Sequence, residues 1–173
     1  MIVAHPDDES MFCGGTVAKF SSWSWDVVCA AHSLGSPRGA EFRNACAILG
    51  GTPIMLDVEY HGKHGGRSLD HAELQTKLAA AVDLAVYDVV LTHNPRGEYG
   101  QRDHKVVHEV VRSAAAGTVW MFGFNELRCD LSVHMDERSH QAKMAALACY
   151  TSQTDRIVLV DVSGAEHFVA IWR

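Results

Sequence analysis

The stretch that first indicates the fold is Ile2-Val3-Ala4-His5-Pro6-Asp7-Asp8-Glu9. Its three apolar residues are typical of a short buried strand, and they run directly into one imidazole and three carboxylates. Similar apolar runs at residues 26–31, 54–56 and 88–92 also end in polar residues, and segments of helical periodicity separate them. Strands that alternate with helices predict βαβ crossovers and a mostly parallel sheet. We therefore expect an α/β fold.

The remaining elements follow from capping residues and periodicity. Helices are expected to begin near five residues, Gly14, Glu41, Asp70, Asp103 and Arg138. Asp70 and Asp103 are predicted to be N-caps. Later apolar runs predict further strands at residues 119–124, 157–162 and 168–172. The chain of 173 residues shows no internal repeat or linker, so we expect one domain spanning residues 1–173.

Composition excludes several classes of protein. With 47% apolar and 21% charged residues, the chain is typical of a soluble globular protein. No apolar run approaches the roughly 20 residues needed to span a bilayer, so we expect no membrane span. A net charge of −6 argues against a nucleic-acid partner. The five cysteines include no CxxC pair and no secretory signal is visible, so we expect reduced thiols and a cytoplasmic location.

The first motif has the composition of a metal site. Ligands of open α/β sheets bind beyond the carboxyl ends of the strands, which is where His5 and the three acids lie. Burying three unpaired carboxylates costs several kcal/mol, and a divalent cation would offset that cost. His5 and Asp8 are spaced to bind one ion from a tight turn, which leaves Asp7 to face a metal-bound water.

A second motif, Gly97 to His104, follows the strand expected at residues 88–92 and so lies at the same edge of the sheet. A third protein ligand from this motif would leave one coordination position open, as in catalytic zinc sites. His104 and His108 are four residues apart and share a helix face, so either is a candidate for that ligand. The glutamate of a zincin motif is absent, since Lys105 stands in its place.

At these two motifs the sequence resembles the PIG-L/LmbE-like family, zinc-dependent N-deacetylases of amino sugars. The family's first signature, AHPDDE, is unbroken from Ala4 to Glu9, and its second, YGHPDH, corresponds to Tyr99–His104. Two looser similarities are an Arg-x-x-Glu helix start with Ala and Leu-Gly after it, and a late Lys…Tyr-x-Ser-Gln segment. Their residues are Arg38, Glu41, Ala45, Leu49 and Gly50, and Lys143, Tyr150, Ser152 and Gln153.

The resemblance implies a fold and a set of roles. The fold is Rossmann-like, with a mostly parallel sheet and helices on both faces. The implied ligands of one zinc ion per chain are His5, Asp8 and His104. Asp7 matches the family's general base, and Asp103 matches an acid that orients a neighbouring histidine. Two histidines and one aspartate also suit iron or cobalt, so other divalent transition metals are compatible with this site.

One departure from the family pattern concerns the acid. The histidine that protonates the leaving amine or stabilises the oxyanion in the family is Gln101 here, and Arg102 replaces the proline. Glutamine can donate a hydrogen bond to an oxyanion, but it cannot deliver a proton near neutral pH. The open alternatives for the acid are His32, His61, His64 and His134, or Asp7 itself acting as a shuttle.

The expected function is metal-dependent hydrolysis of the acetamide of a small N-acetylated amino sugar, with Asp7 as base and Tyr99 or Gln101 helping to hold the oxyanion. Residues expected to contact the substrate are Arg38, Asn94, Arg96, Glu98 and His64. Trp23 and Trp25 could stack on a sugar, but packing in the core or on the surface is the expected role of both. A homo-oligomer is compatible with the sequence. The alternatives are another metal-dependent amidase on the same scaffold, or a metal- or sugar-binding protein whose activity is reduced because of Gln101.

Overall fold

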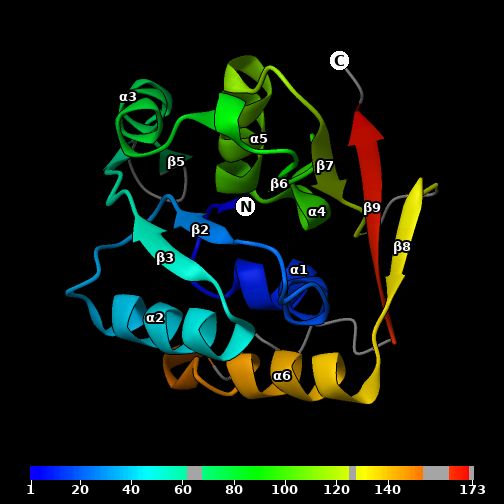
Figure 1. Cartoon of the computed structure of the whole chain (residues 1–173). Coiled ribbons are helices and arrows are strands. Elements are labelled where there is room, and N and C mark those ends of the chain that lie inside the picture. Colours follow the sequence, from blue (N-terminus) through cyan, green and yellow to red (C-terminus); the bar gives the residue numbers. More distant parts are fainter. Residues whose placement is uncertain (62–67, 125–127, 154–163, 172–173) are drawn as a thin grey trace.

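The computed structural model describes residues 1–61, 68–124, 128–153 and 164–171. Figure 1 shows three layers, in which a central sheet lies between helices on both of its faces. Two helices cover one face, α3 (His71–Ala81) and α5 (Arg102–Ala114). Three cover the other, α1 (Asp8–Lys19), α2 (Pro37–Leu49) and α6 (Glu137–Leu147). This arrangement confirms the predicted Rossmann-like α/β class.

The sheet has a parallel part and a mixed part. In the first, β2 (Asp26–Cys29) pairs in parallel with both β1 (Ile2–Val3) and β3 (Thr52–Met55). In the second, β6 (Val90–Thr92) and β7 (Val119–Phe122) are parallel. The hydroxyl of Thr92 donates to the carbonyl of Ile2 at 3.1 Å, so β1 and β6 are neighbours and the two parts adjoin.

The C-terminal strands are antiparallel. β9 (Ala165–Ile171) lies between β7 and β8 (Leu131–His134) and runs antiparallel to both. The sheet is therefore mixed at this edge. A separate antiparallel pair joins β4 (Tyr60–His61) to β5 (Ser68–Leu69). The strand predicted at residues 157–162 lies outside the described residues.

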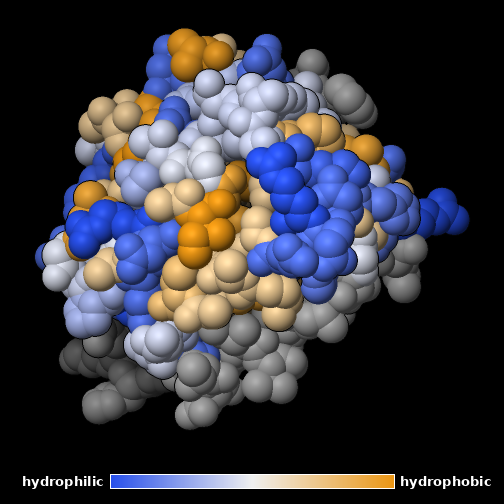
Figure 2. Space-filling view, turned by 60° about the horizontal axis from the view of Figure 1, so that its bottom comes forward, coloured by the Kyte–Doolittle hydropathy of each residue, from blue (hydrophilic) through white to orange (hydrophobic). Residues whose placement is uncertain are grey.

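Each face of the sheet has its own apolar core. Phe42, Leu49 and Phe168 belong to the core between the sheet and α1, α2 and α6. Leu74 and Val110 belong to the core under α3 and α5. Burial of these side chains is the main stabilising contribution, roughly 1.5–3 kcal/mol for each large one. The outer surface of α2 and α6, turned forward in Figure 2, mixes hydrophobic with hydrophilic side chains.

Two helices begin several residues earlier than the sequence predicts. α1 starts at Asp8 rather than near Gly14, because Asp8 and Glu9 are favourable in a first turn, where the helix dipole attracts negative charge. Gly15 lies inside this helix, and its lack of a side chain leaves room for Met135, because a Cβ there would lie 2.0 Å from Met135 Sδ. α2 starts at Pro37 rather than near Glu41.

Capping explains the other boundaries. Ser36 caps α2 by accepting from the N–H of Gly39 at 3.0 Å. Asp136 forms a capping box with Ser139, so α6 begins one residue before the predicted Arg138. The predicted cap at Asp70 is confirmed, since its carboxylate accepts from the N–H of Glu73 at 2.7 Å. The predicted cap at Asp103 is wrong: Gln101 caps α5 instead. No helix among the described residues is long and apolar enough to cross a membrane.

Candidate active site

Backbone strain gathers at the carboxyl edge of the parallel strands. Among the described residues, four that are not glycine have positive φ: Asp7 (123°), His32 (64°), Asp57 (51°) and Glu98 (56°). Each follows a strand, respectively β1, β2, β3 and β6. Such conformations cost about 1–3 kcal/mol each, and they tend to occur where function requires a particular geometry. The edge predicted to hold the site is therefore also where this strain lies.

Asp8 is the centre of a buried cluster at this edge. Its Oδ2 accepts from the backbone N–H of His5 at 2.8 Å and lies 3.4 Å from His5 Nδ1. Its Oδ1 lies 3.3 Å from Nε2 of His104. One ligand atom from each of these three residues lies within 4.8 Å of the others. The structure thus brings together His5 from the turn after β1, Asp8 from the start of α1 and His104 from α5.

Two further carboxylates determine which nitrogen each histidine presents to Asp8. Nε2 of His5 lies 2.9 Å from Asp103 Oδ2, and Nδ1 of His104 lies 2.5 Å from Glu98 Oε2. A carboxylate can only accept, so each of these nitrogens carries the proton and donates. In the neutral rings, the opposite nitrogens then turn lone pairs toward Asp8. Carboxylates that hold the outer nitrogen of a histidine are the usual second shell of a metal site.

Nε2 of His104 is buried and has no hydrogen-bond partner. Its lone pair and Asp8 Oδ1 are two acceptors that face one another at 3.3 Å. An unsatisfied buried acceptor costs about 1–3 kcal/mol, and a bound cation would remove that cost. Two imidazole nitrogens and a carboxylate oxygen are suitable donors for Zn²⁺ and related metals. The residues present therefore fit a metal ion.

His104, rather than His108, lies in this cluster. Nδ1 of His108 bonds to the backbone carbonyl of His93 at 2.8 Å, which orients it away from Asp8. The choice between these two histidines was open from the sequence because both share one face of α5. The loop between β6 and α5 decides it in the structure, since it places the first of them over Asp8.

Asp7 lies beside the cluster and is paired with Arg38. Arg38 Nη2 donates to Asp7 Oδ2 at 2.9 Å and also to the carbonyl of Pro6. Burial and the charge of Asp8 raise the pKa of Asp7 to about 7, although Arg38 acts in the opposite direction. A carboxyl group with a pKa near neutrality can both accept and return a proton at neutral pH.

Glu9 holds the backbone of Asp7 through a hydrogen bond, a role that was not predicted from the sequence. Its buried carboxylate accepts from the N–H of Asp7 at 3.1 Å, and from Ser10 Oγ and Tyr150 OH at 2.5 Å each. Nearby, Glu41 accepts from the N–H and hydroxyl of Ser152 at 2.9 and 2.6 Å. Tyr150, Ser152 and Glu41, which belong to the two looser similarities, therefore form buried or partly buried hydrogen bonds around α1 and α2. In the sequence, the resemblance to the family was the only signal for these residues.

The side chains of Asn94 and Glu98 are buried and form hydrogen bonds with other protein groups. The amide of Asn94 donates to the carbonyls of Phe122 and Phe124 at 3.1 and 3.3 Å, and its oxygen accepts from the N–H of Arg96. Both residues are buried. This placement does not support the prediction that they contact substrate. Arg96 is exposed, and Tyr99 is half-exposed with its ring 5.5 Å from that of His104.

His93 is a buried residue that sequence reasoning did not assign to the site. Its Nε2 accepts from the N–H of Ala4 at 3.0 Å, and its Nδ1 lies 2.9 Å from Glu98 Oε2. The available signal was its position at the end of β6, on the same edge as His5.

The histidines that could replace the missing acid differ in their position relative to the site. His32 is half-buried near the site, and burial together with the charges of Arg38 and His5 lowers its pKa. His134 is exposed at the end of β8. His64 and the side chain of His61 lie outside what the structure describes.

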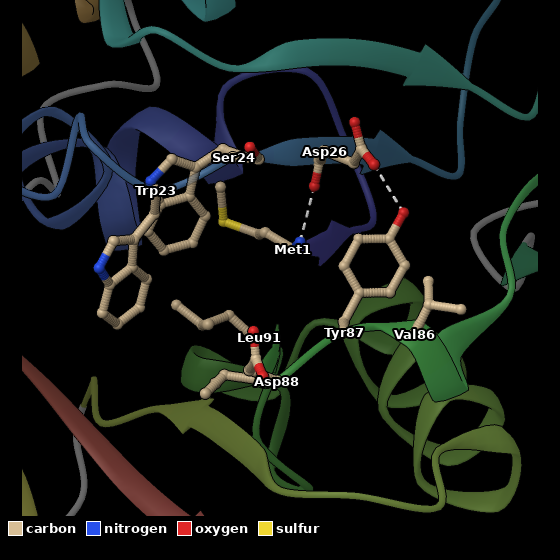
Figure 3. Close-up of a pocket in the computed structure, with 10 residues that line it drawn as sticks. Met1, Trp23, Ser24, Asp26, Val86, Tyr87, Asp88 and Leu91 are labelled. Atoms are coloured by element: carbon tan, nitrogen blue, oxygen red, sulfur yellow. Dashed lines mark hydrogen bonds between the residues drawn. The ribbon is translucent and has the colours of Figure 1, made fainter.

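A separate cavity of about 550 Å³ lies at the opposite, amino ends of β2 and β6 (Figure 3). Trp23 and Trp25 line it, so the structure does not place them where they could stack on a sugar at the candidate active site. Their rings stack on one another, at 5.7 Å between centroids. Asp26 on the cavity wall accepts from Tyr87 OH at 2.6 Å.

Comparison with known proteins identifies relatives of this chain. The profile of the PIG-L family, described as GlcNAc-PI de-N-acetylase, matches residues 1–115. Two curated relatives are 1D-myo-inositol 2-acetamido-2-deoxy-alpha-D-glucopyranoside deacetylases. That of Actinosynnema mirum is 29% identical, with 68% of this chain and 54% of the relative covered. That of Mycobacterium sp. (strain KMS) is 31% identical, with 68% and 49% covered. The chain therefore spans about half the length of these relatives.

Solved structures share the fold. N,N'-diacetylchitobiose deacetylase from Pyrococcus horikoshii has a TM-score of 0.73 at 16% identity, covering 98% of this chain and 82% of that one. The 4-carboxy-2-hydroxymuconate hydratase GalB of Pseudomonas putida has a TM-score of 0.69 at 18% identity, covering 99% and 95%. A deacetylase and a hydratase thus share this fold, so the residues of the site must decide the reaction.

Proposed function

Since the chain belongs to the PIG-L family, we propose that it is a metal-dependent N-deacetylase that hydrolyses the acetamide of an N-acetylglucosamine-type sugar. The observation that carries this proposal is that His5 Nδ1 and His104 Nε2 lie 3.4 and 3.3 Å from the Asp8 carboxylate, while the buried His104 Nε2 has no hydrogen-bond partner. His5, Asp8 and His104 would hold the metal, and three protein ligands leave a position open for water or substrate.

When bound, the metal supplies Lewis acidity, which makes water more acidic and polarises the acetamide carbonyl. The protein supplies the proton transfers. Asp7 accepts the proton of the attacking water, for which a pKa of about 7 suits it. Arg38 keeps the Asp7 carboxylate in place. Tyr99, half-exposed at the rim and in contact with the His104 ring, donates to the developing oxyanion.

Protonation of the leaving amine falls to Asp7 in this mechanism. The oxygen of Gln101 already accepts the N–H of Asp103, and its amide nitrogen has no acidic proton to give. Asp7 holds the proton taken from water and returns it as the C–N bond breaks, which releases acetate and a free amine. His32 is the alternative acid, because among the described candidates it alone lies near His5 and Arg38.

A second candidate function has its own supporting observation. Gln101 serves as a helix cap, which leaves the family's acid position without an acid. A metal- or sugar-binding protein with reduced activity, or an amidase acting on a substrate with a better leaving group, would need no such acid. Adding histidine at this position distinguishes these possibilities, as described in the Discussion.

The test of the proposed function begins with metal content per chain. We expect about one zinc ion in the wild-type protein and loss of it in His5→Ala and Asp8→Ala. His108→Ala is the matched control, because His108 lies on the same helix face as His104 but bonds to a backbone carbonyl. Release of acetate from N-acetylglucosamine and its inositol conjugate should follow metal content. Absence of metal from the wild-type protein after incubation with excess zinc would overturn the proposal.

We further propose a cytoplasmic location and small-molecule substrates. In support, all five cysteines are free thiols, and Cys13, Cys29 and Cys46 are buried, as is usual for reduced cysteine in a reducing compartment. Fractionation of cells that produce the protein tests the location.

A further inference from the structure

We propose that Glu98 is a positioning residue that fixes the tautomer of the buried His104 and thereby directs the free nitrogen of this ring toward Asp8. This inference rests on the proposed function, because it concerns a residue that would hold the metal. Glu98 was expected to contact substrate, and the structure instead places its carboxylate between two imidazole rings.

The contacts of Glu98 are those of a fully engaged, buried carboxylate. Oε2 lies 2.9 Å from Nδ1 of His93 and 2.5 Å from Nδ1 of His104. Oε1 accepts from the N–H of Asn94 at 2.8 Å. The two rings are stacked, with centroids 3.8 Å apart and planes 20° from parallel, so one oxygen reaches both. All three side chains in this arrangement are buried.

The tautomers follow from the partners. The N–H of Ala4 donates to His93 Nε2 at 3.0 Å, so this nitrogen carries a lone pair and the proton of His93 is on Nδ1. His104 Nδ1 faces the same carboxylate oxygen and must also carry its proton. Nε2 of His104 is then the acceptor that faces Asp8. Without a carboxylate at position 98, nothing among these contacts favours this tautomer.

The backbone is built to hold Glu98 in this place. Glu98 has φ 56° and ψ −69°, a backbone conformation that residues other than glycine rarely adopt. The side-chain oxygen of Asn94 holds the turn by accepting from the N–H groups of Arg96 and Glu98, at 2.9 and 3.2 Å. A strained conformation held by several bonds, with its side chain buried on two histidines, is typical of a geometry required by a site.

The first measurement is the tautomer of His104 in the metal-free wild-type protein, read from imidazole ¹⁵N chemical shifts in alkaline solution where the ring is neutral. We expect the Nδ1–H form for both His93 and His104. Finding His104 as the Nε2–H form would overturn the inference. This measurement needs neither metal nor a variant, so it judges the inference even if the wild-type protein binds no metal and the proposed function fails.

The second measurement is the affinity for Zn²⁺ and Co²⁺ of Glu98→Gln, which keeps the size of the side chain and removes its charge. Loss of such an outer partner typically weakens metal binding ~10–100-fold, and we expect that range together with a mixture of His104 tautomers. Glu166→Gln is the matched control, since Glu166 is a buried carboxylate that accepts from Gly15, Thr16 and Lys143 away from the site.

We expect Glu166→Gln to lower stability and to leave metal affinity unchanged. Wild-type affinity and wild-type imidazole shifts in Glu98→Gln would overturn the inference while leaving the proposed function intact. Equal weakening in both variants would also overturn it, because the effect would then be one of general stability. If neither the wild-type protein nor Glu98→Gln binds Zn²⁺ or Co²⁺, this result would count against the proposed function alone, and the His104 tautomer would still judge the inference.

Discussion

The side-chain oxygen of Gln101 accepts a hydrogen bond from the backbone N–H of Asp103 at 3.0 Å. This bond caps α5, the helix that carries Asp103 and His104 into the site. The residue at the family's acid position therefore serves helix formation here. Its replacement should affect stability and catalysis in separable ways.

Gln101→His is expected to lower stability by about 1 kcal/mol, because the cap is lost. If protonation of the amine limits turnover, the same change should raise the rate of acetate release by ~10²-fold or more. Gln101→Ala removes the cap without adding an acid and serves as the control. Steady-state kinetics and urea unfolding measure the two effects. A fall in rate with metal retained would instead indicate a site adapted to another reaction.

Asp7→Asn is expected to keep its metal and to lose activity by ~10²–10⁴-fold, since the amide cannot accept the proton of water. Metal content and the rate of acetate release are to be measured on the same preparation. Normal turnover in this variant would show that the assignment of Asp7 as base is wrong.

Tyr150→Phe removes the hydroxyl that donates to buried Glu9 at 2.5 Å. We expect a loss of about 1–3 kcal/mol in stability, because a buried carboxylate loses a donor. Glu9 also holds the N–H of Asp7, so a lower kcat at nearly unchanged KM, by up to ~10²-fold, should accompany it.

Tyr87→Phe is the matched control for this change, because Tyr87 donates to a carboxylate at 2.6 Å at the opposite edge of the sheet. It should leave kcat unchanged. If both variants slow turnover equally, Tyr150 has no specific role in placing Asp7.

Glu41 is expected to stabilise the protein in a pH-dependent way. Burial would raise the pKa of Glu41, but hydrogen bonds from Ser152 and Thr151 outweigh it and lower the pKa below its usual value. A carboxyl whose folded pKa is lowered contributes stability above the unfolded pKa, and this contribution is lost as pH falls through the folded pKa. Glu41→Gln should therefore cost about 2 kcal/mol at pH 7 and much less in acid.

Urea unfolding of the wild-type protein and Glu41→Gln at several pH values from 7 down to 3 measures this difference. Glu73→Gln is a useful comparison, since Glu73 is paired with Lys77 on an exposed face. A difference between wild type and Glu41→Gln that stays constant with pH would contradict the assigned cause.

Local signals explain why much of the fold was predictable. Short apolar runs and helical periodicity are patterns of residues that are close in sequence. The α/β class and the cap at Asp70 could therefore be predicted. The start of α1 could not, because Gly14 and Gly15 read as a boundary in sequence. They lie inside the helix, where Gly15 leaves room for Met135: a Cβ at this position would lie 2.0 Å from Met135 Sδ.

Local sequence was enough to identify the residue types at the site: His5, Asp7 and Asp8 in one turn, and His104 after a strand that ends at the same edge. Two features of the site could not be predicted in this way: which of His104 and His108 faces Asp8, and that the side chain of Glu98 points inward. These choices depend on the path of one loop and on contacts between residues as far apart as Glu9 and Tyr150. Tertiary packing sets such contacts, because no local pattern encodes the direction of a side chain that a distant element must meet.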